Sequence, residues 1–250
     1  MTRPKRKLLQ QRKELIERYT QRLVRHKISR FARAVARRLL RPQLQWGERK
    51  RKRILAATLQ TVAFEAGRAR KNGFESTASV LNMGLFFLIA ERDIQAMKID
   101  ALTHPDPWQR SLAARVILLT IHELDIDKAA GNKLRQVYQD GQVPQDIQDA
   151  VTDAMRTIRK AQNRAQRQFA DLRNSTIAHR DSDAVRQYRN IVDIENAEVI
   201  KAAAEFYLGT HLFMDAVPRL ITHLATWPGM FAQLKAQSDR ASLSGVNQAP

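Results

Sequence analysis

Apolar side chains recur every three or four residues along most of this 250-residue chain, which is the spacing of one face of an α-helix. No segment alternates apolar and polar residues in the way that a half-buried β-strand does. Because 44% of the residues are hydrophobic, the helices have enough apolar surface to form a core. The sequence therefore predicts an all-α fold.

Prolines, glycines and polar capping residues divide this pattern into separate helices. The predicted helices cover residues 8–44 (one or two amphipathic helices, ending near Pro42), 54–70, 76–101, 108–127 (ending before Gly131), 133–139, 144–172 and 195–225. Pro218 is expected to kink the last helix, and the polar tail after Gln233 is expected to be disordered. The predicted organisation is a helical arm (1–53), a helical bundle (54–230) and a disordered tail (231–250).

Positive charge is concentrated in the predicted arm. Residues 1–53 contain 20 Lys and Arg residues against three acidic residues, and so carry +17 of the net charge of +18. Cations on most faces of a helix, interrupted by Tyr19, Phe31 and Trp46, suit contacts with phosphates and stacking on bases. The candidate nucleic-acid contacts are Arg18, Arg22, Arg25, Arg30, Arg33, Arg37, Arg38, Arg49, Lys50, Arg51, Lys52 and Arg53.

The arm also fits other roles. It could be a surface helix with snorkelling cations, a membrane-surface helix, a docking segment for an acidic protein or a transit peptide. The longest apolar runs, residues 83–90 and 116–121, are far shorter than the roughly 18 residues of a membrane span. We therefore expect a chain without a membrane span.

Several chemistries are excluded or disfavoured by composition. The chain has no cysteine, which excludes disulfides, thiolate metal sites and thiol nucleophiles and fits a reducing cytosol. His122-Glu123 begins like the zinc motif of a metalloprotease, but Ile126 stands where the second histidine is required. The expectation is a cytoplasmic protein with no metal and no cofactor.

A concentrated set of polar and titratable side chains ends the helical pattern that begins at residue 144. Residues 169–181 read Phe-Ala-Asp-Leu-Arg-Asn-Ser-Thr-Ile-Ala-His-Arg-Asp, which places a guanidinium, an amide, two hydroxyls and an imidazole in one short stretch. The spacing of Arg173 and His179 is uninformative alone, because 30 arginines and six histidines produce such pairs by chance. The hydrogen-bonding residues between them distinguish this pair from the chain's other one, which has apolar residues between.

These groups suit RNA cleavage by the RNA's own 2′-hydroxyl, without a metal. His179 can transfer protons near neutral pH, and Arg173 can hold phosphate oxygens with its two-pronged guanidinium. In an unbroken helix the two residues would lie about 120° apart, so their cooperation requires a helix break near Arg173 or a second protomer. A homodimer that pairs two copies of His179 would supply both base and acid. Alternatively, Arg173 caps a helix C-terminus and His179 is an ordinary surface histidine.

The run Leu-Arg-Asn-Ser-Thr-Ile-Ala-His-Arg-Asp at residues 172–181 resembles the signature of the HEPN superfamily of helical ribonuclease domains. Its Ala-His-Arg-Asp ending is closest to the abortive-infection-type members. The resemblance implies an all-α bundle, metal-independent RNA cleavage, a composite site formed by dimerisation, and a role as a toxin or antiviral effector. It also implies that Arg173 and His179 are the catalytic pair and that Asn174 supports them.

Ser175, Thr176 and Asp181 are further candidates for supporting the site, although Asp181 and Asp183 also suit a helix start. The expected partners are RNA, including structured or ribosome-associated RNA, a second copy of the chain, and an antitoxin or another defence protein. Some proteins with similar motifs bind without cutting. The alternative function is therefore a non-catalytic helical module that binds nucleic acid or protein through the basic arm.

Overall fold

The structure is a computed structural model that describes the backbone of residues 3–177 and 182–246. Side chains are described at residue 35 and from residue 38 onward, except at 177–181, 241 and 243–250. The candidate residues His179 and Asp181 therefore lie outside the described residues, as do the candidate arm side chains Arg18, Arg22, Arg25, Arg30, Arg33 and Arg37. Every element in the described part is helical, which confirms the predicted all-α class.

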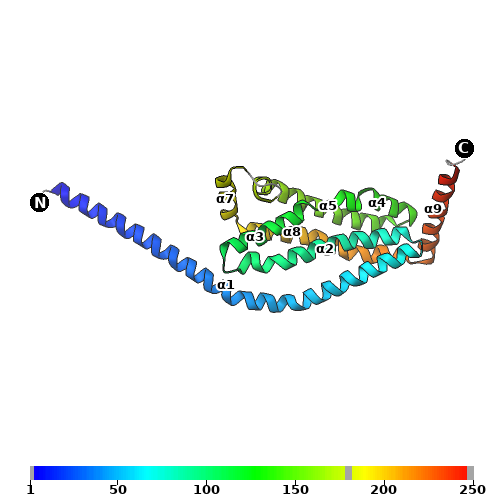
Figure 1. Cartoon of the computed structure of the whole chain (residues 1–250), viewed down its shortest axis with the longest axis horizontal. Helices are drawn as coiled ribbons and strands as arrows, with labels where there is room; N and C mark the ends of the chain where they lie inside the picture. Colours follow the sequence, from blue (N-terminus) through cyan, green and yellow to red (C-terminus); the bar gives the residue numbers. More distant parts are fainter. Residues whose placement is uncertain (1–2, 178–181, 247–250) are drawn as a thin grey trace.

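The elements form a helical bundle with one long helix along its side (Figure 1). In chain order they are α1 (Arg3–Lys71), α2 (Glu75–Thr103), α3 (Pro107–His122), α4 (Ile126–Asp140), α5 (Gln145–Gln168), α6 (Ala170–Leu172), the π-helical turn η1 (Arg173–Ile177), α7 (Ala184–Val192), α8 (Asn196–Leu224) and α9 (Trp227–Val246). The N-terminal part of α1 extends beyond the bundle, and α9 lies at the opposite end (Figure 1).

The core lies between α2, α3, α5 and α8. Helix α5 buries one stripe at three-to-four spacing, including Val151, Met155 and Ile158, and leaves its charged residues outside. Gly209 lets α8 approach α5 closely, because a Cβ built there would lie 2.8 Å from the backbone nitrogen of Ile158. The core thus fixes the position of α5, the helix that leads to the motif.

The sequence predicts a helix that ends near Pro42, and this prediction is wrong. Helix α1 continues through Pro42 as one helix of 69 residues, although an internal proline removes a backbone hydrogen bond and costs about 3 kcal/mol. Contacts with α2 on both sides of this position offset the cost: Arg41 pairs with Asp100 at 2.7 Å, and Glu48 pairs with Lys98 at 2.6 Å. The arm and the first predicted helix of the bundle are therefore one continuous element.

Two other predicted boundaries are wrong. Helix α3 ends at His122, and α4 starts only four residues later because the side chain of Asp125 accepts a hydrogen bond from the backbone nitrogen of Lys128 at 2.9 Å. Helix α4 then continues through Gly131, where the sequence predicts a break.

The C-terminal segment also differs from the prediction of disorder after Gln233, because α9 continues to Val246. Its inner face is anchored to the bundle. The side chain of Gln233 is buried and donates to the carbonyl of Leu224 at 2.9 Å, and Arg240 holds the buried Asp140 at 2.8 Å.

The predicted helices at 76–101 and 195–225 correspond closely to α2 and α8, and Pro218 lies inside α8. None of the helices in the described residues is long and apolar enough to span a membrane.

Candidate functional site

The helical run that leads to the motif breaks at Phe169, before Arg173. Helix α5 ends at Gln168, and Phe169 leaves α-helical geometry with φ −116° and ψ 24°. The single turn α6 follows, and residues 173–177 then form the π-helical turn η1. Such π-helical turns are rare and frequently occur at functional sites.

The hydroxyls of the motif hold this turn from the inside. Ser175 is buried, and its Oγ donates to the carbonyl of Asp171 at 2.7 Å while accepting from Nδ2 of Asn190 at 2.8 Å. Thr176 Oγ1 donates to the carbonyl of Leu172 at 2.7 Å. These bonds tie η1 to the preceding turn and to α7, whereas the side chain of Asn174 is exposed.

Helix α7 begins at the acidic residue that the sequence marks as a helix start. Oδ1 of Asp183 accepts hydrogen bonds from the backbone nitrogens of Val185 and Arg186, both at 3.0 Å. The chain that follows the motif is therefore fixed by its own cap and by the Asn190 contact.

Arg173 lies beside a carboxylate at the C-terminal end of α3. Its Nε and Nη2 donate to Oε1 of Glu123 at 3.2 and 3.0 Å, and the two side chains are 40% and 51% exposed. Two of the five guanidinium N–H donors are used in this way, and the group remains open to solvent. Sequence reasoning missed Glu123, because nothing local to either residue shows that they meet.

His122 lies next to this ion pair but inside the protein. The residue is 6% exposed. Within the described part of the chain, neither ring nitrogen makes a hydrogen bond of normal distance and angle. Burial lowers the pKa of His122, and the charge of Arg173 lowers it further; the backbone of Ala165 and the carboxylate of Glu123 oppose the shift without reversing it. The imidazole is therefore neutral at neutral pH.

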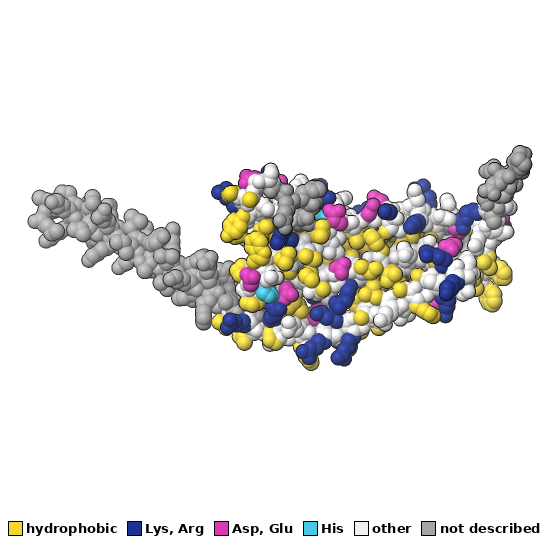
Figure 2. All heavy atoms as spheres, viewed as in Figure 1, with side chains coloured by type: hydrophobic (Ala, Val, Ile, Leu, Met, Phe, Trp, Pro, Cys, Tyr) yellow, Lys and Arg dark blue, Asp and Glu magenta, His cyan; other side chains and the backbone are white. Residues whose placement is uncertain are grey.

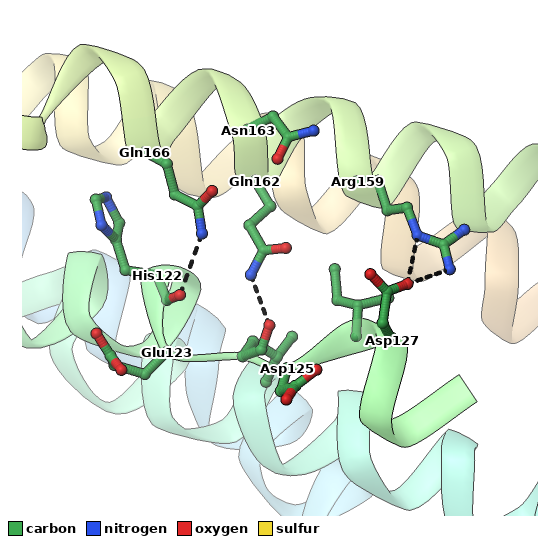
Figure 3. A pocket seen from close by; sticks show the side chains of 10 residues that line it. His122, Glu123, Asp125, Asp127, Arg159, Gln162, Asn163 and Gln166 are labelled. Atoms are coloured by element: carbon green, nitrogen blue, oxygen red, sulfur yellow. Dashed lines mark hydrogen bonds and ion pairs between the residues drawn. The ribbon is translucent and has the colours of Figure 1, made fainter. Parts of the chain in front are cut away.

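A pocket of about 460 Å³ lies between α5 and the turn that joins α3 to α4 (Figure 3). From α5, Gln162 donates to the carbonyl of Leu124 at 2.7 Å, and Gln166 to that of His122 at 3.3 Å. Farther along, Arg159 pairs with Asp127 at 2.7 Å. Two glutamines one helical turn apart on α5 are the sequence signal that could have located this pocket.

The pocket walls carry amides and carboxylates, which suit a polar ligand. Among the described residues, no group of three or more His, Asp and Glu side chains could hold a metal ion. The carboxylates have other partners: Asp125 caps α4, Asp127 pairs with Arg159, and Glu123 pairs with Arg173.

Comparison of the chain with protein families, curated proteins and solved structures gives no match.

The basic face of α1 is a second candidate region. Of the predicted contacts with described side chains, Arg38, Arg49, Lys50, Arg51 and Arg53 are exposed and Lys52 is half-buried. Lys and Arg side chains alternate with hydrophobic ones along the edge of the molecule that α1 forms, the lower edge in Figure 2. The structure thus places cations and apolar groups together on the free side of this helix.

Proposed function

We propose that the protein is an endoribonuclease that cleaves RNA without a metal, with η1 at the centre of its site. The observation that carries the proposal is the π-helical geometry of η1, which replaces α-helical geometry at residues 173–177 of the motif. A continuous α-helix would separate the groups of the motif around its axis. The π-helical turn instead presents Arg173 and Asn174 to solvent while Ser175 and Thr176 hold the turn from within.

In this proposal the reaction begins at the 2′-hydroxyl. His179 takes the hydroxyl proton, the 2′-oxygen forms a bond to the adjacent phosphorus, and the bond from phosphorus to the 5′-oxygen breaks. The 5′-oxygen takes a proton, leaving a 5′-hydroxyl and a 2′,3′-cyclic phosphate. Arg173 binds the phosphate oxygens as their charge increases, and Asn174 donates from its amide.

A second copy of the chain would supply the acid through its own His179, so we propose a homodimer. The basic arm would hold the RNA, since each phosphate contact adds affinity without demanding a particular base. An RNA-cleaving protein of this kind would act as a toxin or an antiviral effector, silenced by an antitoxin or another defence protein.

The cleavage test uses end-labelled RNA in the presence of a chelator. We expect wild type to leave 2′,3′-cyclic phosphate ends, and His179→Ala and Arg173→Ala to lose cleavage by at least about 100-fold. Arg167→Ala is the matched control, because Arg167 is an exposed arginine on α5 whose side chain donates to the carbonyl of Asn163 in its own helix. Thermal unfolding shows whether each variant is folded.

Cleavage that survives His179→Ala, or that requires a divalent metal, contradicts the proposal. Tight, salt-sensitive RNA binding with no cleavage supports the non-catalytic binding module instead. A growth test in cells addresses the toxin role and compares wild type, His179→Ala and a chain that starts at residue 38. This truncation removes the part of α1 that precedes the Arg41–Asp100 pair, so the packing of α1 on α2 stays intact.

A further inference from the structure

We propose that α1 carries a binding surface for single-stranded nucleic acid formed by Trp46, Arg49, Lys50 and Arg53, here called the Trp46 surface. In it the indole of Trp46 stacks on an unpaired base, and the three cations contact the flanking phosphates. The inference deepens the proposed function and rests on it only for the identity of the strand as RNA.

The four side chains share one face of α1. Their positions follow one another at i, i+3, i+4 and i+7, which are neighbouring positions on a helix surface. Trp46 is 76% exposed, and the three cations are exposed as well. The opposite face is already occupied, because Glu48 and Leu55 are buried. An aromatic ring and three cations therefore face solvent side by side.

No described acidic side chain neutralises the positive charge of this surface. Glu48 is the only acidic residue between positions 38 and 64, and it points into the bundle. Its carboxylate accepts from Lys98 at 2.6 Å and from Gln95 at 2.9 Å. In the part of the chain that the structure describes, no ion pair involves Arg49, Lys50 or Arg53. These cations are thus available to an anionic partner.

An exposed tryptophan among free cations fits a single strand better than a duplex. The bases of a duplex are stacked on one another, whereas an unpaired base can stack on an aromatic side chain with a gain of about 1–3 kcal/mol. A membrane surface fits less well, because helices that lie in a membrane separate their apolar and basic faces. Here the ring and the cations share the free face.

The experiment measures binding of an oligodeoxythymidylate of about 12 nucleotides. This probe lacks the 2′-hydroxyl and cannot be cleaved by the proposed reaction, so loss of cleavage and loss of binding are separate results. A variant with Trp108→Phe and Trp227→Phe leaves Trp46 as the single tryptophan. We expect the probe to quench its emission.

Substitutions then separate stacking from charge. Trp46→Ala should weaken binding about 10-fold with an unchanged salt dependence, and Trp46→Phe should restore most of the affinity. Replacing the three cations with glutamine should make the logarithmic salt slope shallower by about 2, since each single-strand phosphate contact contributes roughly 0.7. Trp227→Ala is the matched control, because Trp227 is an equally exposed tryptophan at the far end of the molecule.

Two outcomes would overturn the inference. One is unchanged binding in Trp46→Ala together with equal affinity for a duplex of the same length, which would leave only unspecific attraction to phosphates. The other is a blue shift of Trp46 emission on vesicles containing anionic lipid, with no response to the oligonucleotide, which would assign the surface to membranes.

Discussion

Arg173 directs two guanidinium nitrogens at a single carboxylate oxygen of Glu123, a residue 50 positions earlier in the chain. The pair is about half exposed, so it stabilises the fold by less than about 1 kcal/mol. Its importance is chemical: Glu123 occupies the guanidinium that the proposed reaction assigns to the RNA phosphate.

We expect Glu123→Gln to lower the KM for RNA several-fold and to leave the melting temperature nearly unchanged, because a neutral amide competes less well than a carboxylate for Arg173. Steady-state cleavage kinetics and thermal unfolding measure the two effects. Glu205→Gln is the control. Glu205 pairs with Arg164 at the same distance of 3.0 Å, but this ion pair does not involve the motif. A loss of kcat as large as that of Arg173→Ala would show that Glu123 is needed for the reaction and does not compete with the phosphate.

The stability of the protein should depend on pH through His122. Its folded-state pKa lies below the unfolded value of about 6.5, so the folded state is favoured above that pH and loses this contribution as the pH falls toward the folded pKa. The loss reaches up to about 1.4 kcal/mol per pH unit. Urea unfolding at several pH values between 7.5 and 5 gives the free energy of unfolding as a function of pH. This free energy should change less steeply with pH in His122→Gln than in wild type, with a substitution of the exposed His211, His211→Gln, as the control. Equal slopes in wild type and His122→Gln would contradict this assignment.

Two glycines in helices should respond in opposite ways to alanine. At Gly209 the new methyl would lie 2.8 Å from backbone and side-chain atoms of Ile158, so Gly209→Ala should destabilise by about 1–3 kcal/mol. At Gly131 the nearest atom is 4.0 Å away, so Gly131→Ala should stabilise by about 0.5–1 kcal/mol through helix propensity. Denaturant midpoints of the two variants give the comparison, and the same sign for both would refute the packing argument.

Removal of the Glu48 carboxylate should loosen α1 from α2. Glu48→Ala leaves Lys98 and Gln95 without their partner in a largely buried position, which should cost about 2 kcal/mol. Limited proteolysis of residues 41–71 should become faster. The control is Glu65→Ala, which breaks an i,i+3 pair between the half-buried Glu65 and the exposed Arg68 and should change stability by less than about 0.5 kcal/mol. Similar effects of the two substitutions would mean that Glu48 does not anchor the helix.

The spacing of apolar residues in the sequence predicted those helices that bury one continuous apolar face. The three-to-four spacing located α5, and the polar run after Arg173 indicated a departure from α-helical geometry, which η1 shows at residues 173–177. The end near Pro42 was predicted wrongly, because contacts of α1 with α2, distant in sequence, override the local cost of a proline.

The environment of Arg173 could not be predicted for a similar reason. Glu123 and His122 reach it only because α3 packs beside η1, and their sequence neighbourhood indicated only a helix that continues to residue 127 and a zinc motif without its second histidine. The hydrogen bonds of the Ser175 and Thr176 hydroxyls could not be predicted either. They are made to backbone carbonyls that come within reach only once the turn has formed.

Helix α1 also sets a length. At 1.5 Å per residue, its stretch from residue 3 to residue 37 is about 50 Å long, and the ion pair of Arg41 with Asp100 follows it. A nucleic-acid strand bound both at the N-terminal end of α1 and at the Trp46 surface would be held at two points a fixed distance apart along the helix. The protein would then select its targets by the length of the strand as well as by its charge. A strand too short to span this part of α1 would bind at one of the two points and not at both.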